Sequence, residues 1–243
     1  MAEQGNIDKL LDCARERARV LFALCTELHY DDRQELLHDV RVASRRLTEV
    51  LGLFKPLCDP AELAAERTWL ADLRRAVRAV RDADVTAEVL EQTLAEACEP
   101  TELADAYRAE IWPRRQQDLA RLRQMLAEQD LDQHRRALLG MLRIGRDGPG
   151  KVRRKLRKRL FRRIESRRAK LARQGALAVE SRQIEQIHQA RIAGKKLRYT
   201  LELAHESKII RLKPTLRLLR SYQALDPRRG NCLIIELPEV PLG

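Results

Sequence analysis

The amino-acid sequence predicts an all-α fold. Apolar residues recur at intervals of three and four residues along nearly the whole chain, the spacing that places them on one face of a helix. The residues between them are mainly Ala, Leu, Glu, Gln and Arg, which are strong helix formers. Gly and Pro occur only 10 and 9 times in 243 residues, a composition that argues against collagen-like and turn-rich β folds.

Chemical signals mark the ends of several helices. Asp31 and Asp32 are expected to cap the second helix. Pro60 and Pro100 are expected to begin the third and the fifth. Pro113 predicts a kink or a restart inside the fifth. The periodicity gives nine helices, over residues 7–28, 33–54, 61–80, 84–97, 101–127, 131–143, 151–173, 181–206 and 208–224.

Arg81, Asp82 and Asp84 lie together between the third and fourth expected helices. Such a group could serve acid–base or metal chemistry, but aspartates also accept hydrogen bonds from the free N–H groups of a helix start. We expect this structural role for both aspartates, with Arg81 paired locally. The sequence shows no nucleophile elbow, phosphate-binding loop, H-E-x-x-H motif or paired carboxylates. It therefore predicts no catalytic residue, no metal site and no cofactor.

Breaks in helical periodicity suggest how the chain is divided. Residues 145–150 (GRDGPG) form its densest Gly/Pro cluster. We expect a domain boundary there, with a first bundle over 1–145 and a second over 146–243. After Leu225 the periodicity is lost, and 233–237 is the one strand-like run, which we expect to be a packed extended tail.

The positive charge is concentrated in one segment. The chain carries a net charge of +12, and residues 151–173 contain thirteen basic residues and one acid, Glu165. A solvated helix face normally mixes both signs, so this segment favours binding to a polyanion. The sequence does not decide which of its cations face a ligand. The best candidates are Arg153, Arg154, Arg157, Lys158, Arg162 and Arg163.

A short sequence pattern occurs twice, 150 residues apart. Residues 38–47 read HDVRVASRRL and residues 188–197 read HQARIAGKKL. At about 100° per residue, His38, Arg41 and Arg45 fall in one stripe. The second copy repeats this stripe with His188, Arg191 and Lys195, and Arg198 widens it. The apolar residues of the first copy fall on the opposite face of the helix: Val40, Leu47, Leu51 and Phe54.

Together with these copies, three further motifs resemble the CHAD family, histidine-containing α-helical domains that often accompany triphosphate-hydrolysing CYTH domains. The motifs are the FKP that follows the first copy, the RDADV at 81–85 and the KKLRY at 195–199. The resemblance covers roughly residues 8–225. It implies two antiparallel helical bundles related by an internal pseudo-twofold repeat. The histidine and basic faces would line a positively charged groove or pore that binds inorganic polyphosphate.

The chain departs from the family pattern in two places. Thr48 and Glu49 stand where the second copy has Arg198 and Tyr199, so the first face has fewer cations. The second half has no counterpart of the motif at 81–85, which leaves open whether its bundle is complete. Carried over by position, the polyphosphate-binding residues of the two copies are His38, Arg41, Arg45, Arg46, His188, Arg191, Lys195, Lys196 and Arg198.

The chief alternative is binding of RNA or DNA through the basic segment 151–173. Aromatic residues are only 4% of the chain and Phe161 is the one aromatic in this segment, so platforms for base stacking are scarce. Trp69 and Trp112 are expected in the core. A polyphosphate kinase or phosphatase, with His38 or His188 as the nucleophile that accepts the phosphoryl group, ranks lower, because no carboxylates for Mg²⁺ accompany either histidine. We therefore expect a non-enzymatic binding protein.

The sequence also bears on location. The amino terminus has no apolar leader segment, and no run approaches eighteen apolar residues. The five cysteines are scattered without C-x-x-C spacing and are expected to be reduced thiols. We therefore expect a cytoplasmic protein with no membrane span, recruited to polyphosphate granules.

Overall fold

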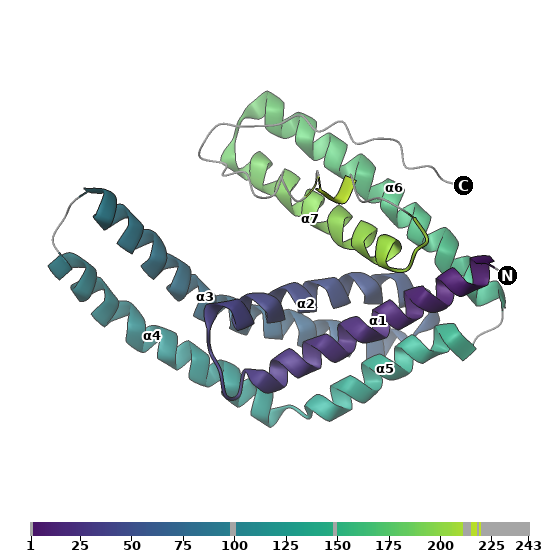
Figure 1. Cartoon of the computed structure of the whole chain (residues 1–243), viewed down its shortest axis with the longest axis horizontal. Helices are drawn as coiled ribbons and strands as arrows, with labels where there is room; N and C mark the ends of the chain where they lie inside the picture. The colour runs from purple at the N-terminus through teal and green to yellow at the C-terminus, as the bar shows by residue number, and fades with distance from the viewer. Residues whose placement is uncertain (1, 98–100, 148–149, 211–214, 218, 220–243) are drawn as a thin grey trace. The chain divides into compact units, whose positions relative to one another are not determined.

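The chain is described from a computed structural model, for residues 2–97, 101–147, 150–210, 215–217 and 219 (Figure 1). All regular elements in these ranges are helical, so the prediction of an all-α fold is confirmed. The elements are α1 (Ala2–Glu27), α2 (Gln34–Phe54), the short 3₁₀ helix η1 (Lys55–Leu57), α3 (Pro60–Ala97), α4 (Thr101–Glu128), α5 (Leu131–Asp147), α6 (Gly150–Ser181) and α7 (Ile184–Glu206).

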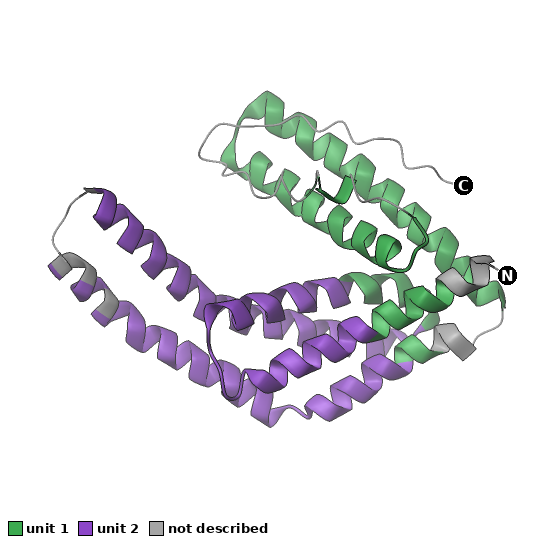
Figure 2. Cartoon of the chain, in the orientation of Figure 1, with its two compact units in different colours: residues 1–15, 49–57, 141–243 green, residues 16–48, 58–140 purple. Residues whose placement is uncertain are grey.

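Contacts divide the chain into two compact units (Figure 2). Unit 1 comprises residues 1–15, 49–57 and 141–243, and unit 2 comprises 16–48 and 58–140. Helix α2 therefore begins in unit 2 and ends in unit 1. In unit 1, α6 and α7 form a helical hairpin (Figure 1). In unit 2, α3 and α4 form a second one.

The expected break before Asp84 is wrong. Helix α3 runs without interruption from Pro60 to Ala97, so neither Asp82 nor Asp84 caps a helix start. Residues 81–84 contain neither Gly nor Pro, and the buried Asp84 instead forms an ion pair with Arg115 of α4. Because Arg115 compensates the buried charge of Asp84, this aspartate can lie inside a continuous helix. The sequence pattern alone had indicated a helix cap.

The Arg115 side chain joins three parts of unit 2. Its Nε and Nη2 donate to the Asp84 carboxylate, and Nη1 donates to Asp32 Oδ2 at 2.7 Å. Its Nη2 also donates to the Asp32 carbonyl oxygen at 3.0 Å. These bonds raise the pKa of Arg115 against the opposing effect of burial, which is the largest single influence on it. Asp32 is thus bound to α4, whereas Asp31 accepts a hydrogen bond from the Arg33 N–H just before α2.

The core of unit 2 contains a stack of three rings. Phe22 packs on Trp69 with ring centroids 5.4 Å apart, and Trp69 packs on His134 at 4.6 Å. His134 Nδ1 lies 3.0 Å from Glu66 Oε1, and burial raises the pKa of Glu66. Trp69 is buried as predicted, but Trp112 is 58% exposed, so its expected place in the core is wrong.

Two expectations about prolines can be compared with the helices. Helix α3 begins at Pro60, as predicted, whereas Pro100 lies outside the described residues. Helix α4 continues through Pro113, so no helix restarts there. Of the two expectations for Pro113, the restart is therefore wrong, while the kink stays a prediction.

The C-terminal expectations fall mostly on residues that are not described. Of the ninth expected helix, 208–224, residues 208–210 form a turn and a bend, so its expected start is wrong, while residues 215–217 and 219 are helical. The strand-like run 233–237 lies outside the described ranges. Within those ranges, no helix is both long enough and apolar enough to cross a membrane.

Candidate functional site

Helix α6 carries the basic segment and faces the core of unit 1 with one apolar stripe. Leu156, Leu160, Ile164 and Leu171 are buried, while most of the cations between them are at least partly exposed. Helix α6 packs against α7 in the hairpin. This packing therefore fixes which cations of α6 point into the interior of unit 1 and which point to its surface.

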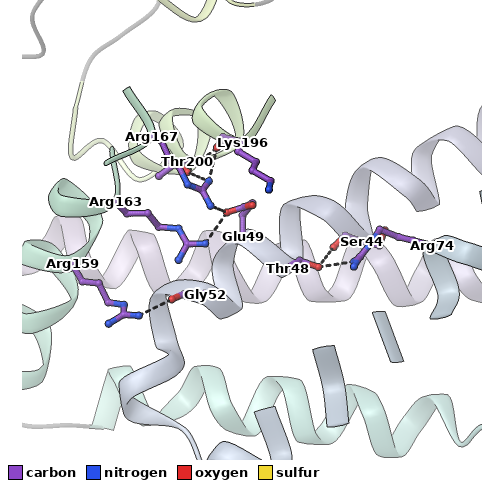
Figure 3. Close-up of polar contacts among 10 residues, drawn as sticks. All are labelled: Ser44, Thr48, Glu49, Gly52, Arg74, Arg159, Arg163, Arg167, Lys196 and Thr200. Carbon is purple, nitrogen blue, oxygen red and sulfur yellow. Dashed lines mark hydrogen bonds and ion pairs between the residues drawn. The ribbon is translucent and has the colours of Figure 1, made fainter. Parts of the chain in front are cut away.

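Arg167 is an inward cation of α6 that holds neighbouring helices (Figure 3). Its Nη1 donates to Thr200 Oγ1 and to the Lys196 carbonyl oxygen of α7, both at 2.5 Å. Its Nη2 forms an ion pair with Glu49 of α2. Burial lowers the pKa of Arg167, and the charge of Glu49 opposes this effect. With three partners inside unit 1, this guanidinium has a structural role.

Two further arginines lie one and two turns earlier on α6. Arg163 Nη2 donates to Glu49 Oε2 at 2.9 Å, so Glu49 contacts two arginines. Arg159 Nη2 donates to the Gly52 carbonyl oxygen at 3.2 Å. Figure 3 shows these contacts between α6 and the last turns of α2. They place both guanidinium groups at the wall of a cleft.

This cleft, called the cationic cleft below, has a volume of about 450 Å³. Five cations and no acid contribute to its lining, and its apolar part comes from the end of α2, η1 and α6. A concave surface of one charge sign concentrates counter-ions, so the cleft suits a ligand with several negative charges. The lining residues are Leu53, Pro56, Leu57, Lys155, Leu156, Lys158, Arg159, Arg162 and Arg163.

Three of these cations face away from the core of unit 1. Lys155, Lys158 and Arg162 are exposed, and none of them forms an ion pair with a residue in the described part of the chain. They succeed one another at helical spacings of three and four residues, so their charges lie along one side of α6. Mutual repulsion of such charges costs stability, which a polyanion would relieve.

The other predicted residues of α6 lie outside the cleft lining. Arg153 forms an ion pair with Asp8 of α1 at 3.2 Å. The Arg157 guanidinium lies over the Phe161 ring at 5.3 Å, and Arg154 is exposed. The lining thus includes Lys158, Arg162 and Arg163 from the predicted set.

Sequence reasoning missed two residues of the cleft, Lys155 and Arg159. A signal for them was present, because positions 155, 158, 159, 162 and 163 follow the i, i+3, i+4, i+7, i+8 pattern of one helix face. The contribution of the α2 end and η1 had no such signal, since it depends on packing between segments about a hundred residues apart.

The first copy of the repeat lies on α2 within unit 2. Its predicted apolar face, Val40 and Leu47 among others, is buried, while His38 is exposed. Arg41, Arg45 and Arg46 are half-buried. The next residue beyond this copy, Thr48, accepts a hydrogen bond from Arg74 Nη1 at 2.7 Å and donates one to the Ser44 carbonyl (Figure 3).

The second copy lies on α7 within unit 1. His188 and Lys196 are exposed, and Arg191 and Lys195 are half-buried. Arg198 forms an ion pair with the buried Glu202 at 3.0 Å, and its guanidinium lies 4.9 Å from the centre of the Tyr199 ring. The two copies thus belong to different units. That their faces line one groove remains a prediction.

Fold and cleft together define a class: an all-helical domain with its positive charge concentrated on one helix. Within that class, a model of the CHAD domain family matches residues 13–225, and the chain belongs to this family. The family resemblance seen in the sequence motifs is therefore confirmed.

A solved structure adds to this result. The crystal structure of the CHAD domain from the plant Ricinus communis has a TM-score of 0.67 to this chain, at 20% sequence identity. The match covers 93% of this chain and 74% of that one. At this level of identity the likeness shows a shared fold. A comparison with curated proteins gave no match.

Proposed function

We propose that this CHAD domain binds inorganic polyphosphate and performs no chemistry on it. The observation that carries the proposal is the cationic cleft of unit 1, with five cations and no acid in its lining. Membership of the CHAD family supports the same ligand, because the family motifs imply polyphosphate binding.

The chemistry of the lining fits condensed phosphate. Lys155, Lys158 and Arg162 supply three charges in succession along α6. Lysine offers a compact point charge and arginine a planar fork for two phosphate oxygens. A linear polyanion places negative charges at successive positions, so each cation can contact a different phosphate. Counter-ions released from the polyanion add to the affinity.

The repeated histidine faces extend this proposal. We infer that the residues of both copies line the same groove, in two bundles over 1–145 and 146–243 that are related by a pseudo-twofold axis. What supports this inference is the burial pattern of each copy by itself. His38 and His188 are both exposed, on helices whose opposite faces are buried. In the cell, such a module would recruit this protein to polyphosphate granules in the cytoplasm.

The test is calorimetric titration of the full chain with long-chain polyphosphate at about 150 mM salt. The cleft variant K155A/K158A/R162A is expected to bind about a hundredfold more weakly, since each lost phosphate contact contributes roughly 1 kcal/mol or more. The matched control R67A/R114A/R121A removes three exposed charges of unit 2 and should bind like the wild type. Equal losses in both variants would mean that net charge alone binds the polyanion.

Competition separates polyphosphate from nucleic acid. Because recognition of single-stranded RNA relies on base stacking, and aromatic residues are only 4% of the chain, RNA should compete poorly. If RNA displaces polyphosphate at equal phosphate concentration, specificity for the inorganic chain is rejected.

A further inference from the structure

One cation of the cleft, Arg163, points toward the interior of unit 1 rather than into the open cleft. Arg163 lines the cleft, yet its Nη2 donates to Glu49 at 2.9 Å, and its side chain is only 23% exposed. Its Nε is buried and has no hydrogen-bond partner among the described residues. A buried donor without an acceptor costs free energy, so the inward position leaves Arg163 incompletely satisfied.

The inward position depends on a glycine. A Cβ atom built on Gly52 of α2 would overlap the guanidinium of Arg163, with Nη1, Nη2 and Cζ as its nearest neighbours. The overlapping atoms are the far end of a flexible side chain, so a larger residue at position 52 would displace that end rather than the helix. Gly52 therefore provides the space that the inward guanidinium occupies.

Glu49 keeps an ion-pair partner when the Arg163 guanidinium moves away from it. The same oxygen, Oε2, also contacts Arg167, which is further bound to Thr200 and to the Lys196 carbonyl. Departure of Arg163 thus leaves the half-buried Glu49 carboxylate paired with Arg167. The cost of releasing Arg163 is one partly buried ion pair, which an anion in the cleft must replace.

We propose that Glu49 and Gly52 hold Arg163 back, so that the cationic cleft selects condensed phosphates over single phosphate ions. A condensed phosphate can contact Lys155, Lys158 and Arg162 and still offer oxygens to a released Arg163. A single phosphate ion offers one group, which must replace the Glu49 carboxylate without those additional contacts. This inference rests on the proposed function and assigns Glu49 and Gly52 as specificity-determining positioning residues.

Two independent substitutions test this proposal, and both are expected to release Arg163. Glu49→Gln weakens the hold on Arg163 but keeps an oxygen acceptor for Arg167. Gly52→Ala fills the space behind the guanidinium and leaves the backbone acceptor of Arg159 in place. Each is expected to raise the affinity for orthophosphate about fivefold, equivalent to about 1 kcal/mol, and that for tripolyphosphate by less. The selectivity ratio between the two ligands should therefore fall.

Arg163→Ala provides the decisive control. If Arg163 carries the effect, Gly52→Ala should produce no gain in a chain that also carries Arg163→Ala, so the two substitutions should be non-additive. The readouts are calorimetric affinities for orthophosphate and tripolyphosphate, with thermal unfolding confirming that each variant folds.

The outcomes separate this inference from the proposed function. If K155A/K158A/R162A loses polyphosphate binding while Glu49→Gln and Gly52→Ala keep the wild-type selectivity, the function stands and the inference is overturned. If the cleft variant binds like the wild type, both are overturned. A loss of selectivity in both single variants that disappears with Arg163→Ala supports the inference.

Discussion

A buried arginine of unit 2 and a row of exposed cations in unit 1 differ in how their charges are compensated. In unit 2, Arg115 is 5% exposed and is bound by Asp84 and Asp32, so its charge is neutralised within the fold. In unit 1, Lys155, Lys158 and Arg162 lie along one side of α6 and line a cleft without acids. Internal pairing makes a cation part of the structure, whereas a row of like charges in a cleft suits an anionic ligand.

The largest expected effect comes from removing the buried cation of unit 2. Arg115→Ala leaves the carboxylates of Asp84 and Asp32 without this partner, and we expect the free energy of unfolding to fall by about 3 to 5 kcal/mol. Chemical denaturation measures this change. Arg114→Ala, at the exposed neighbouring position, is the matched control and should change stability by less than about 0.5 kcal/mol. Similar losses for the two variants would contradict the structural role of Arg115.

An intermediate effect is expected from the pH dependence of unit 2. Burial raises the pKa of Glu66 above its ordinary value of 4.5, and the hydrogen bond from His134 partly offsets this. A raised pKa in the folded state means that the native protein holds this proton more tightly than the unfolded chain. The resulting stabilisation is complete below pH 4.5 and is lost as the pH rises through the folded pKa.

Glu66→Gln removes that titration, so the wild type should lose stability relative to this variant as the pH rises from 4.5. Urea denaturation of both proteins between about pH 4 and pH 7 provides the measurement. His134 and Glu62 are the other titratable groups that influence Glu66. Glu62→Gln therefore serves as the control: it removes the charge of Glu62 but keeps the titration of Glu66 itself. A difference between wild type and Glu66→Gln that stays constant with pH would refute the expected role of burial.

The smallest expected effect concerns the stability of the cleft variant. K155A/K158A/R162A removes side chains with no ion pair in the described part of unit 1, so its unfolding free energy should stay within about 0.5 kcal/mol of the wild type or rise. Thermal unfolding without polyphosphate measures this. A marked loss of stability would show that these cations support the fold and would remove the contrast with Arg115.

Local pattern predicted most of the helices and much of the cleft. The helix that carries the basic segment was predicted from its periodicity, and Lys158, Arg162 and Arg163 were predicted from charge density. The partners of these cations were not, because they come from distant parts of the chain. Glu49 was read as a weakness of the first repeat, whereas it contacts Arg163 and Arg167 over more than a hundred residues of sequence.

The same limit explains the error at Asp84. A cap and a buried ion pair require the same residue type, and only the position of Arg115 on α4 distinguishes them. The sequence thus predicts which side chains can bind anions, while tertiary packing decides which of them are already neutralised.

The salt dependence of polyphosphate binding tests the central claim most directly. A plot of log affinity against log salt concentration should have a steep negative slope for the wild type, by analogy with nucleic-acid binding. For K155A/K158A/R162A, the loss of three phosphate contacts should make this slope shallower by about two to three. Equal slopes and equal affinities for the two proteins would contradict the assignment of the cationic cleft as the polyphosphate site.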